Sequence, residues 1–279
     1  MTNYAFSSLR VTEERAARKP RRQGLTMVVD GLDSGWLSIE AAEQLLDVAG
    51  PYIDLIKIGW LTARFVDSDY LRRKLRLYRE RNVISFTGGM LLEAAHLQRK
   101  ALPIIKEASE IGFDCMEISD SVAQLSVNTK LKLLEAVLHH GMKAVVEVGK
   151  KGPDVDLGPR QVIPVIKKFL AAGAYKVIVE SEQIAALFEG RSDAADLGAL
   201  KEIVSAVGVE HLIFEVPYGK PVSDVLGDVW WFVETFGANV NLANIEPRHA
   251  LAVETVRHGY GFRGGLWSTA AGGAELATL

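Results

Sequence analysis

Short runs of apolar and often β-branched residues recur along the chain, and longer stretches with helical periodicity separate them. Such a run is typical of a buried strand, while apolar residues three or four positions apart are typical of a helix that packs on a sheet. Helices are predicted at 38–47, behind a capping serine, and at 128–140 and 159–172, each of which ends near a glycine. Strands are predicted near residues 25–30, 53–58, 83–87, 115–118, 144–148, 176–179, 211–215 and 239–242.

The regular alternation of strand and helix predicts the fold class. Eight units of about 30 residues, with no linker rich in proline, glycine or serine, are typical of a closed (β/α)₈ barrel. The competing arrangement is an open doubly wound sheet, which needs fewer units and carries a Gly-x-Gly-x-x-Gly turn that this chain lacks after its first strand. We therefore predict an α/β protein with a single (β/α)₈ TIM barrel at 24–263, a charged N-terminal arm at 1–23 and a short flexible C-terminal tail at 264–279.

Composition and charge narrow the classes of partner. A net charge of −3 gives no basic surplus for binding nucleic acid. No run of about 18 apolar residues is present, so no membrane segment is expected, and the N-terminus lacks the apolar core of a secretory signal. The lone Cys115 excludes an internal disulfide and fits a reducing compartment, so we predict a cytoplasmic protein. The charged arm is suited to cover the barrel or a neighbouring subunit, which favours a homo-oligomer.

One stretch, residues 143–152, carries an unusual concentration of charge. Its apolar run is typical of a buried strand and ends in Glu147, and Lys150 and Lys151 come directly after Val148 and Gly149. Unpaired charge is costly to bury, so charges at the end of a buried strand are expected to face a ligand, a metal ion or one another. The alternative is a solvated loop with two surface lysines.

The carboxyl ends of the strands hold the active site in nearly every barrel of this kind, so the residues predicted there are candidates for the site. Charged and amide side chains stand at most of the predicted ends, and two adjacent glycines follow the third strand. The candidates are Asp30, Lys57, Gly88, Gly89, Glu117, Asp120, Glu147, Glu180, Glu215, Asn241 and Asn244.

Four successive strands, the fourth to the seventh, each bring a glutamate to this rim. Carboxylates at that density repel one another and raise one another's pKa unless a cation lies among them. Oxygen ligands suit a hard ion such as Mg²⁺. One glutamate in such a place is commonly a helix cap or half of an ion pair, but four at equivalent positions favour a metal site.

Lysines at the ends of the second and fifth strands have several candidate uses. Lys57, Lys150 and Lys151 can balance the charge of an anionic substrate or transfer a proton, since a neighbouring cation and burial lower the pKa of a lysine. A Schiff-base lysine, as in class I aldolases, is a further alternative, against which the glutamate-rich rim argues. Gly88 and Gly89 let backbone N–H groups approach an anion at a helix start, although a plain tight turn has the same pattern.

Six motifs stand in order at the predicted strand ends. They are Lys57-Ile-Gly-Trp60, Gly88-Gly89 with Glu93, Glu117-Ile-Ser-Asp120, Glu147-Val-Gly-Lys-Lys151, Ile213-Phe-Glu215 and Asn241-Leu-Ala-Asn-Ile245. Over residues 24–263, their order and spacing resemble those of the phosphosulfolactate synthase family, which includes plant heat-stress-associated homologues.

The resemblance implies a carbon–sulfur bond-forming lyase that adds sulfite to phosphoenolpyruvate with Mg²⁺, the first step toward coenzyme M or a related sulfonate. Sulfite would attack C3, and negative charge would develop on the carboxylate as an enediolate. It further implies that Glu117, Glu147 and Glu180 hold Mg²⁺. Lys151, or else Lys150, would protonate C2, and Lys57 would neutralise the carboxylate or the sulfite. The residues left to bind the substrates are Asp30, Gly88, Gly89, Asp120, Glu215, Asn241 and Asn244.

Two strand ends depart from the family's pattern. Asp30 is followed by Gly31, where the archaeal pattern has Asp-Lys-Gly, and Glu180 is followed by a segment without the family's arginine and glycines. Both changes weaken the recognition of two anionic substrates. Two alternatives therefore stay open: the same enolate-stabilising barrel with another nucleophile or acceptor, and a non-catalytic, stress-associated interaction protein. The intact glutamates, kept together with Lys150 and Lys151, argue against the second.

Overall fold

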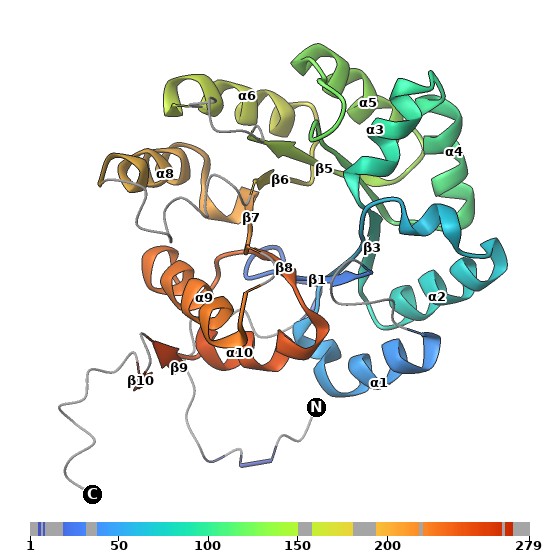
Figure 1. Ribbon diagram of the computed structural model, residues 1–279. Coiled ribbons are helices and arrows are strands. Elements are labelled where there is room, and N and C mark those ends of the chain that lie inside the picture. The colour runs from blue at the N-terminus through green and yellow to red at the C-terminus, as the bar shows by residue number, and fades with distance from the viewer. Residues whose placement is uncertain are drawn as a thin grey trace, which may run out of the picture.

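The computed structural model describes residues 5, 6, 8, 19–31, 38–149, 158–180, 194–217, 220–263 and 266–269. Eight strands form a closed barrel in chain order, with parallel neighbours throughout, and the last strand pairs with the first (Figure 1). The predicted (β/α)₈ TIM barrel is confirmed. The strands are β1 (Thr26–Asp30), β2 (Leu55–Ile58), β3 (Ile84–Thr87), β4 (Cys115–Ile118), β5 (Lys143–Val148), β6 (Lys176–Val179), β7 (Leu212–Glu215) and β8 (Leu242–Ile245).

A ring of helices surrounds the barrel (Figure 1). Helices α1 (Ile39–Ala49), α5 (Val127–His139) and α6 (Pro159–Ala171) lie where the periodicity predicted them. The capping serine predicted for α1 is present, since Ala41 N donates to Ser38 Oγ at 3.1 Å. The other helices are α2 (Ser68–Glu80), α3 (Gly89–Leu97), α4 (Ala101–Ile111), α8 (Ala194–Val207), α9 (Val222–Phe236), α10 (Ala250–Arg257) and the 3₁₀ helices η2 (Gly50–Tyr52), η3 (Thr62–Phe65), η4 (Val209–His211) and η5 (Pro247–His249).

An antiparallel hairpin, β9 (Tyr260–Arg263) and β10 (Leu266–Thr269), follows the barrel. The sequence pattern did not predict it, and β10 falls within the stretch expected as the tail. Within the described ranges, no helix combines the length and apolar character that crossing a bilayer requires.

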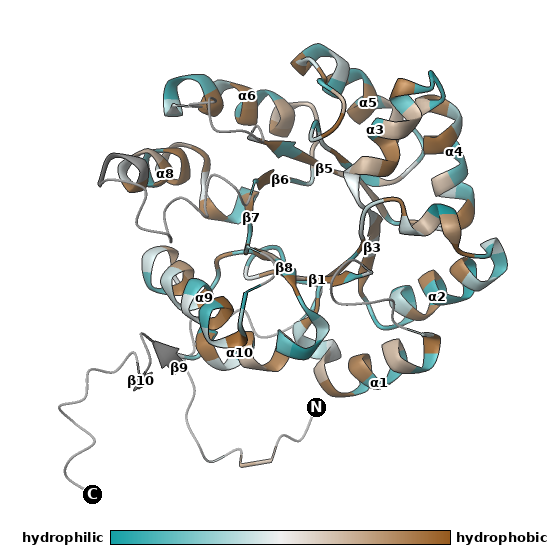
Figure 2. Ribbon diagram, in the orientation of Figure 1, coloured by the Kyte–Doolittle hydropathy of each residue, from teal (hydrophilic) through white to brown (hydrophobic). Residues whose placement is uncertain are grey.

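The strands alternate between two apolar environments, because successive side chains of a strand point to opposite faces. The interior cluster takes one residue from each strand, and the neighbouring residues pack outward against the helices, whose hydrophobic and hydrophilic positions alternate in Figure 2. On β2, β4, β5 and β7, the residue two positions after the interior residue also points inward, nearer the carboxyl end of its strand. Four charged side chains therefore point into the carboxyl end of the barrel: Lys57, Glu117, Glu147 and Glu215. The interior apolar residues on the strands are Met27, Leu55, Phe86, Cys115, Val145, Ile178, Ile213 and Ala243.

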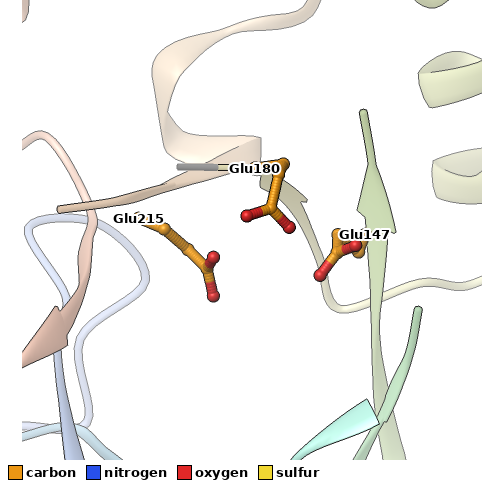
Figure 3. A group of neighbouring side chains, drawn as sticks. All are labelled: Glu147, Glu180 and Glu215. Carbon is orange, nitrogen blue, oxygen red and sulfur yellow. The ribbon is translucent and has the colours of Figure 1, made fainter. Parts of the chain in front are cut away.

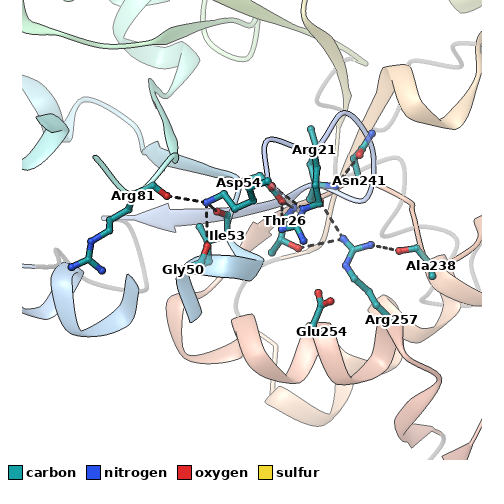
Figure 4. Close-up of polar contacts among 12 residues, drawn as sticks. Arg21, Thr26, Gly50, Ile53, Asp54, Arg81, Ala238, Asn241, Glu254 and Arg257 are labelled. Carbon is teal, nitrogen blue, oxygen red and sulfur yellow. Dashed lines mark hydrogen bonds and ion pairs between the residues drawn. The ribbon is translucent and has the colours of Figure 1, made fainter. Parts of the chain in front are cut away.

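A buried polar network closes the opposite, amino-terminal end of the barrel (Figure 4). Arg21 donates from Nε and Nη2 to the two carboxylate oxygens of Asp54 at 3.0 and 2.8 Å. Arg257, 1% exposed, donates from Nη1 to the carbonyl oxygens of Ala238 and Val240 at 2.7 Å each. Its Nη2 also donates to Leu25 O at 3.1 Å, so Arg257 joins the segment before β8 to the segment before β1, where the barrel closes. The Arg21–Asp54 pair joins the segment before β1 to the segment before β2.

Asn241 belongs to this closed end, which corrects the predicted position of the eighth strand. The strand was predicted at 239–242 and lies at Leu242–Ile245. Asn241 therefore precedes β8, where its Oδ1 accepts from Leu25 N at 2.9 Å and its Nδ2 donates to Leu212 O at 2.6 Å. An amide that can pair with several main-chain groups gives no hydropathy signal of its own, so the apolar pattern misplaced the strand.

Candidate functional site

Three buried glutamates converge at the carboxyl end of the barrel. Glu147 lies on β5, Glu180 directly follows β6 and Glu215 ends β7. Each offers a carboxylate oxygen, and these oxygens all lie within 4.8 Å of one another. The side chains point from adjacent strands into the same space (Figure 3). Three oxygen donors in this arrangement could hold a metal ion.

Lys57 lies beside this group and makes two ion pairs. Its Nζ lies 2.8 Å from Glu117 Oε2 and 3.1 Å from Glu215 Oε1. The lysine comes from β2, three strands away from β7 around the closed barrel, so the ammonium group reaches Glu215 through the interior. The carboxylates that lie within 4.8 Å of one another are those of Glu147, Glu180 and Glu215, whereas the resemblance implied Glu117 in place of Glu215; Lys57 pairs with both Glu117 and Glu215.

Burial and mutual repulsion set the protonation of these carboxyls. Burial raises the pKa of Glu147 well above its ordinary value, and the charges of Glu117, Glu180 and Glu215 raise it further. Burial also raises the pKa of Glu117, which Lys57 partly opposes. A proton or a bound cation would relieve this repulsion, and perturbed carboxyls of this kind are concentrated at functional sites.

Gly88 and Gly89 allow the start of α3 to approach the site closely. A Cβ at Gly88 would lie 2.8 Å from the backbone nitrogen of Trp60. A Cβ at Gly89 would lie 2.0 Å from Ser119 Oγ and 3.1 Å from Glu117 Oε1. The two glycines are therefore required by packing at the rim, whatever else they bind.

Two other candidates point elsewhere. The carboxylate of Asp30 accepts from Tyr78 OH at 2.6 Å and pairs with Lys74 Nζ at 2.5 Å, so it faces α2 in the layer between strand and helix. Asn241 lies at the closed amino-terminal end. Neither side chain lies with the glutamates.

Asp120 and Asn244 lie at the carboxyl rim. Asp120 pairs with Lys130 Nζ at 2.9 Å. Asn244 is 5% exposed and has a φ of +59°, at a place where β8 has one more residue than β1 between paired positions. Such a bulge re-aims side chains at the rim of a barrel. Lys150 and Lys151 fall outside the described residues.

No role was predicted for two buried charged residues that contact the segment between β4 and α5. Glu93 of α3 and Lys130 of α5 are 1% and 4% exposed. Each is a charged residue among apolar neighbours in its helix, and this pattern was the only sign in the sequence that it is buried. Their partners lie on other elements, so the sequence could not supply the contacts.

Comparisons with known proteins show which proteins this chain resembles. The family model described as (2R)-phospho-3-sulfolactate synthase (ComA) matches residues 14–263. The phosphosulfolactate synthase of Methanothermobacter thermautotrophicus is 31% identical over 246 residues, covering 86% of this chain and 91% of the relative. Protein HEAT-STRESS-ASSOCIATED 32 of Arabidopsis thaliana is 22% identical over 265 residues, covering 86% of this chain and 87% of the plant protein.

The solved structures support the fold. KGPDC from Streptococcus mutans superimposes with a TM-score of 0.52 at 15% identity, covering 83% of this chain and 94% of that chain. Since the family match extends over nearly the whole barrel, the chain belongs to the phosphosulfolactate synthase (ComA) family.

Proposed function

We propose that the protein is a Mg²⁺-dependent lyase that adds sulfite to phosphoenolpyruvate to give phosphosulfolactate. The observation that carries the proposal is the buried group of Glu147, Glu180 and Glu215 beside Lys57, in a member of this family. Among the residues that the structure describes, four carboxyls and one ammonium group meet there, so the ionised carboxyls carry more charge than the lysine offsets. A divalent cation offsets that excess.

The three glutamates fit a hard divalent cation. Their ligand oxygens lie within 4.8 Å of one another, so one ion could contact all three carboxylates. All three residues supply oxygen, which Mg²⁺ prefers to nitrogen or sulfur. Waters and substrate oxygens would complete an octahedral shell.

The proposed reaction forms one carbon–sulfur bond and adds one proton to the substrate. The S–C3 bond forms, the π electrons of C2–C3 move toward the carboxylate, and C2 then takes a proton, so the phosphate ester stays intact. Mg²⁺ supplies Lewis-acid stabilisation of the charge on the carboxylate. Lys57 contributes a fixed positive charge, which its pairs with Glu117 and Glu215 hold inside the barrel. Lys151, or else Lys150, delivers the proton to C2.

The start of α3 is the proposed position for one anionic group of the substrates. The helix begins at Gly89, after the N-cap Gly88, and its first N–H groups have no partner within the helix. The helix dipole favours negative charge there. Asn244, at the bulge of β8, is the proposed hydrogen-bonding partner on the other side of the rim.

The test is to incubate the purified protein with phosphoenolpyruvate, sulfite and Mg²⁺ and to follow products by mass spectrometry. Formation of phosphosulfolactate that EDTA abolishes supports the proposal. Binding of phosphoenolpyruvate without product points to another nucleophile.

A second candidate function rests on the similarity to the plant heat-stress-associated protein. It predicts a non-catalytic barrel that binds neither phosphoenolpyruvate nor a divalent cation. Titration of each ligand by calorimetry separates the two candidates, because the lyase must bind both.

A further inference from the structure

The carboxylate of Glu93 grips the loop between β4 and α5, residues 119–126. Its Oε1 accepts hydrogen bonds from Ser119 Oγ and, at 3.1 Å, from Ser121 N. Its Oε2 accepts from Val122 N at 2.5 Å and from Ala123 N at 2.6 Å. One side chain of α3 thus fixes four donors of a loop that lies far from it in the sequence.

Because Glu93 is buried, its carboxylate depends on the hydrogen bonds from the loop. The residue is 1% exposed, and an ionised carboxylate in such a place is costly unless donors surround it. Four donors satisfy both oxygens, and hydrogen bonds to an ionised group are stronger than those between neutral groups. Deleting the charge leaves several of these donors without an acceptor, which carries its own cost.

The gripped loop contacts Glu147, one of the three candidate metal ligands. Ser121 Oγ donates to Glu147 Oε1 at 3.4 Å. Asp120 of the same loop pairs with Lys130 at 2.9 Å, and Lys130 Nζ donates to the carbonyl oxygen of Glu147 at 2.8 Å. The loop therefore contacts the side chain of Glu147 directly and is connected to the main chain of Glu147 through Lys130.

The close approach of α3 to the loop depends on a glycine at the start of the helix. Ser119, which donates to Glu93, lies where a Cβ on Gly89 would be, at 2.0 Å from its hydroxyl oxygen. α3 can carry Glu93 to the loop because Gly89 has no side chain. Gly89 and Glu93 lie four residues apart, so both face the loop from the same side of α3.

We propose that Glu93 is a positioning residue, which holds the β4–α5 loop so that Ser121 and Lys130 orient Glu147 toward a bound divalent cation. The inference rests on the proposed cation site. Residues that orient a metal ligand through hydrogen bonds commonly change the affinity for the metal by about 10–100-fold when they are replaced.

The test compares Glu93→Gln with the unmodified protein, using Mn²⁺ as a spectroscopic substitute for Mg²⁺. We expect the dissociation constant for Mn²⁺, measured by electron paramagnetic resonance, to rise at least about tenfold. We also expect the amides of Val122 and Ala123 to exchange with solvent at least about tenfold faster, because they lose a charged acceptor. Glu135→Gln is the matched control, since Glu135 is an exposed residue of α5, and both quantities should stay unchanged.

A second variant separates the two parts of the inference and covers the case in which Glu93→Gln does not fold. Ser121→Ala removes the contact with Glu147 and keeps the four bonds to Glu93, one of which comes from the Ser121 backbone. It should weaken Mn²⁺ binding without faster exchange at Val122 and Ala123.

The outcomes are distinct. Unchanged Mn²⁺ affinity in both variants, with normal binding by the unmodified protein, overturns the role of Glu93 and leaves the proposed function standing. If Glu93→Gln binds Mn²⁺ more weakly but the amides of Val122 and Ala123 exchange at the same rate, then loosening of the loop is not the cause of the weaker binding, and the proposed role is wrong. A lower melting temperature without a change in Mn²⁺ affinity indicates a merely structural residue. No Mn²⁺ binding by the unmodified protein overturns the proposed cation site and this role with it.

Discussion

The ammonium group of Lys57 lies 2.8 Å from Oε2 of Glu117 inside the barrel, with the two side chains 10% and 3% exposed. The pair joins β2 to β4 across the interior, and the same ammonium group reaches Glu215. A buried ion pair contributes little net stability, but removing one partner leaves an uncompensated charge. The positive charge of Lys57 is therefore needed to keep the carboxylates of Glu117 and Glu215 close together in the folded protein.

Lys57→Met tests this dependence. We expect a loss of about 3–5 kcal/mol in the free energy of unfolding at neutral pH, measured by urea denaturation, because Glu117 and Glu215 lose their counter-charge. The loss should shrink in acid, where the Glu117 carboxyl, whose pKa burial raises, is protonated. Lys106→Met is the control, since Lys106 pairs with Glu110 on the surface and should cost less than about 1 kcal/mol.

Glu147→Gln should stabilise the metal-free protein. The pKa of Glu147 in the fold is raised above its ordinary value of 4.5, so the folded protein holds a proton that the unfolded chain releases as the pH rises. Stability from this group is therefore present below pH 4.5 and is lost as the pH rises toward the folded pKa. In EDTA, the variant should melt at least about 2 °C above the unmodified protein at pH 8, and the difference should shrink toward pH 5.

The same pair of proteins tests the cation site. Mg²⁺ should raise the melting temperature of the unmodified protein, because a ligand that binds the folded state stabilises it. The variant should respond much less. A melting difference that does not change with pH would contradict the assigned protonation of Glu147.

Asp30→Asn should be strongly destabilising although Asp30 lies away from the glutamates. Lys74 and Asp30 are both 0% exposed, and Lys74 would keep a buried charge without a carboxylate. We expect a loss of about 3–5 kcal/mol in urea denaturation. The double variant Asp30→Asn with Lys74→Met should recover most of it, since neither charge remains. Equal losses in the single and double variants would show that the charge of Lys74 is not the cause.

Two glycine-to-alanine changes should have opposite effects. Gly89→Ala brings a Cβ to 2.0 Å from Ser119 Oγ and should cost at least about 1–3 kcal/mol, together with weaker Mn²⁺ binding. Ser119→Gly in the same protein should restore part of the loss. Gly198→Ala, within α8 and with no atom in range of the new Cβ, should stabilise by about 0.5–1 kcal/mol.

Lys151→Ala should abolish turnover and keep the binding of phosphoenolpyruvate. The proposed role is delivery of a proton to C2, so the loss should fall on kcat with little change in KM. Lys150→Ala should retain more activity, and a larger loss in that variant would exchange the two roles. Normal turnover by Lys151→Ala would exclude it as the acid.

The sequence by itself determined the architecture and the place of the site. The alternation of apolar runs and amphipathic stretches predicted the eight strands, with the eighth placed three residues too early, and three of the helices, because these periods follow from the geometry of each element. Parallel strands end at one rim, so the positions of Lys57, Glu117, Glu147 and Glu215 could be predicted without coordinates.

Only the tertiary structure decided which of these charges meet. Asp30 ends a strand that is buried on both faces, so no alternation in the sequence tells that its side chain points outward to Lys74. The exchange of Glu117 for Glu215 among the candidate ligands depends on how far each strand is staggered when the barrel closes. The grip of Glu93 on the β4–α5 loop joins residues that lie about 30 positions apart. Hydropathy reports the face of an element that is buried, but pairing between buried polar groups depends on distances that exist only after the strands have closed into a barrel.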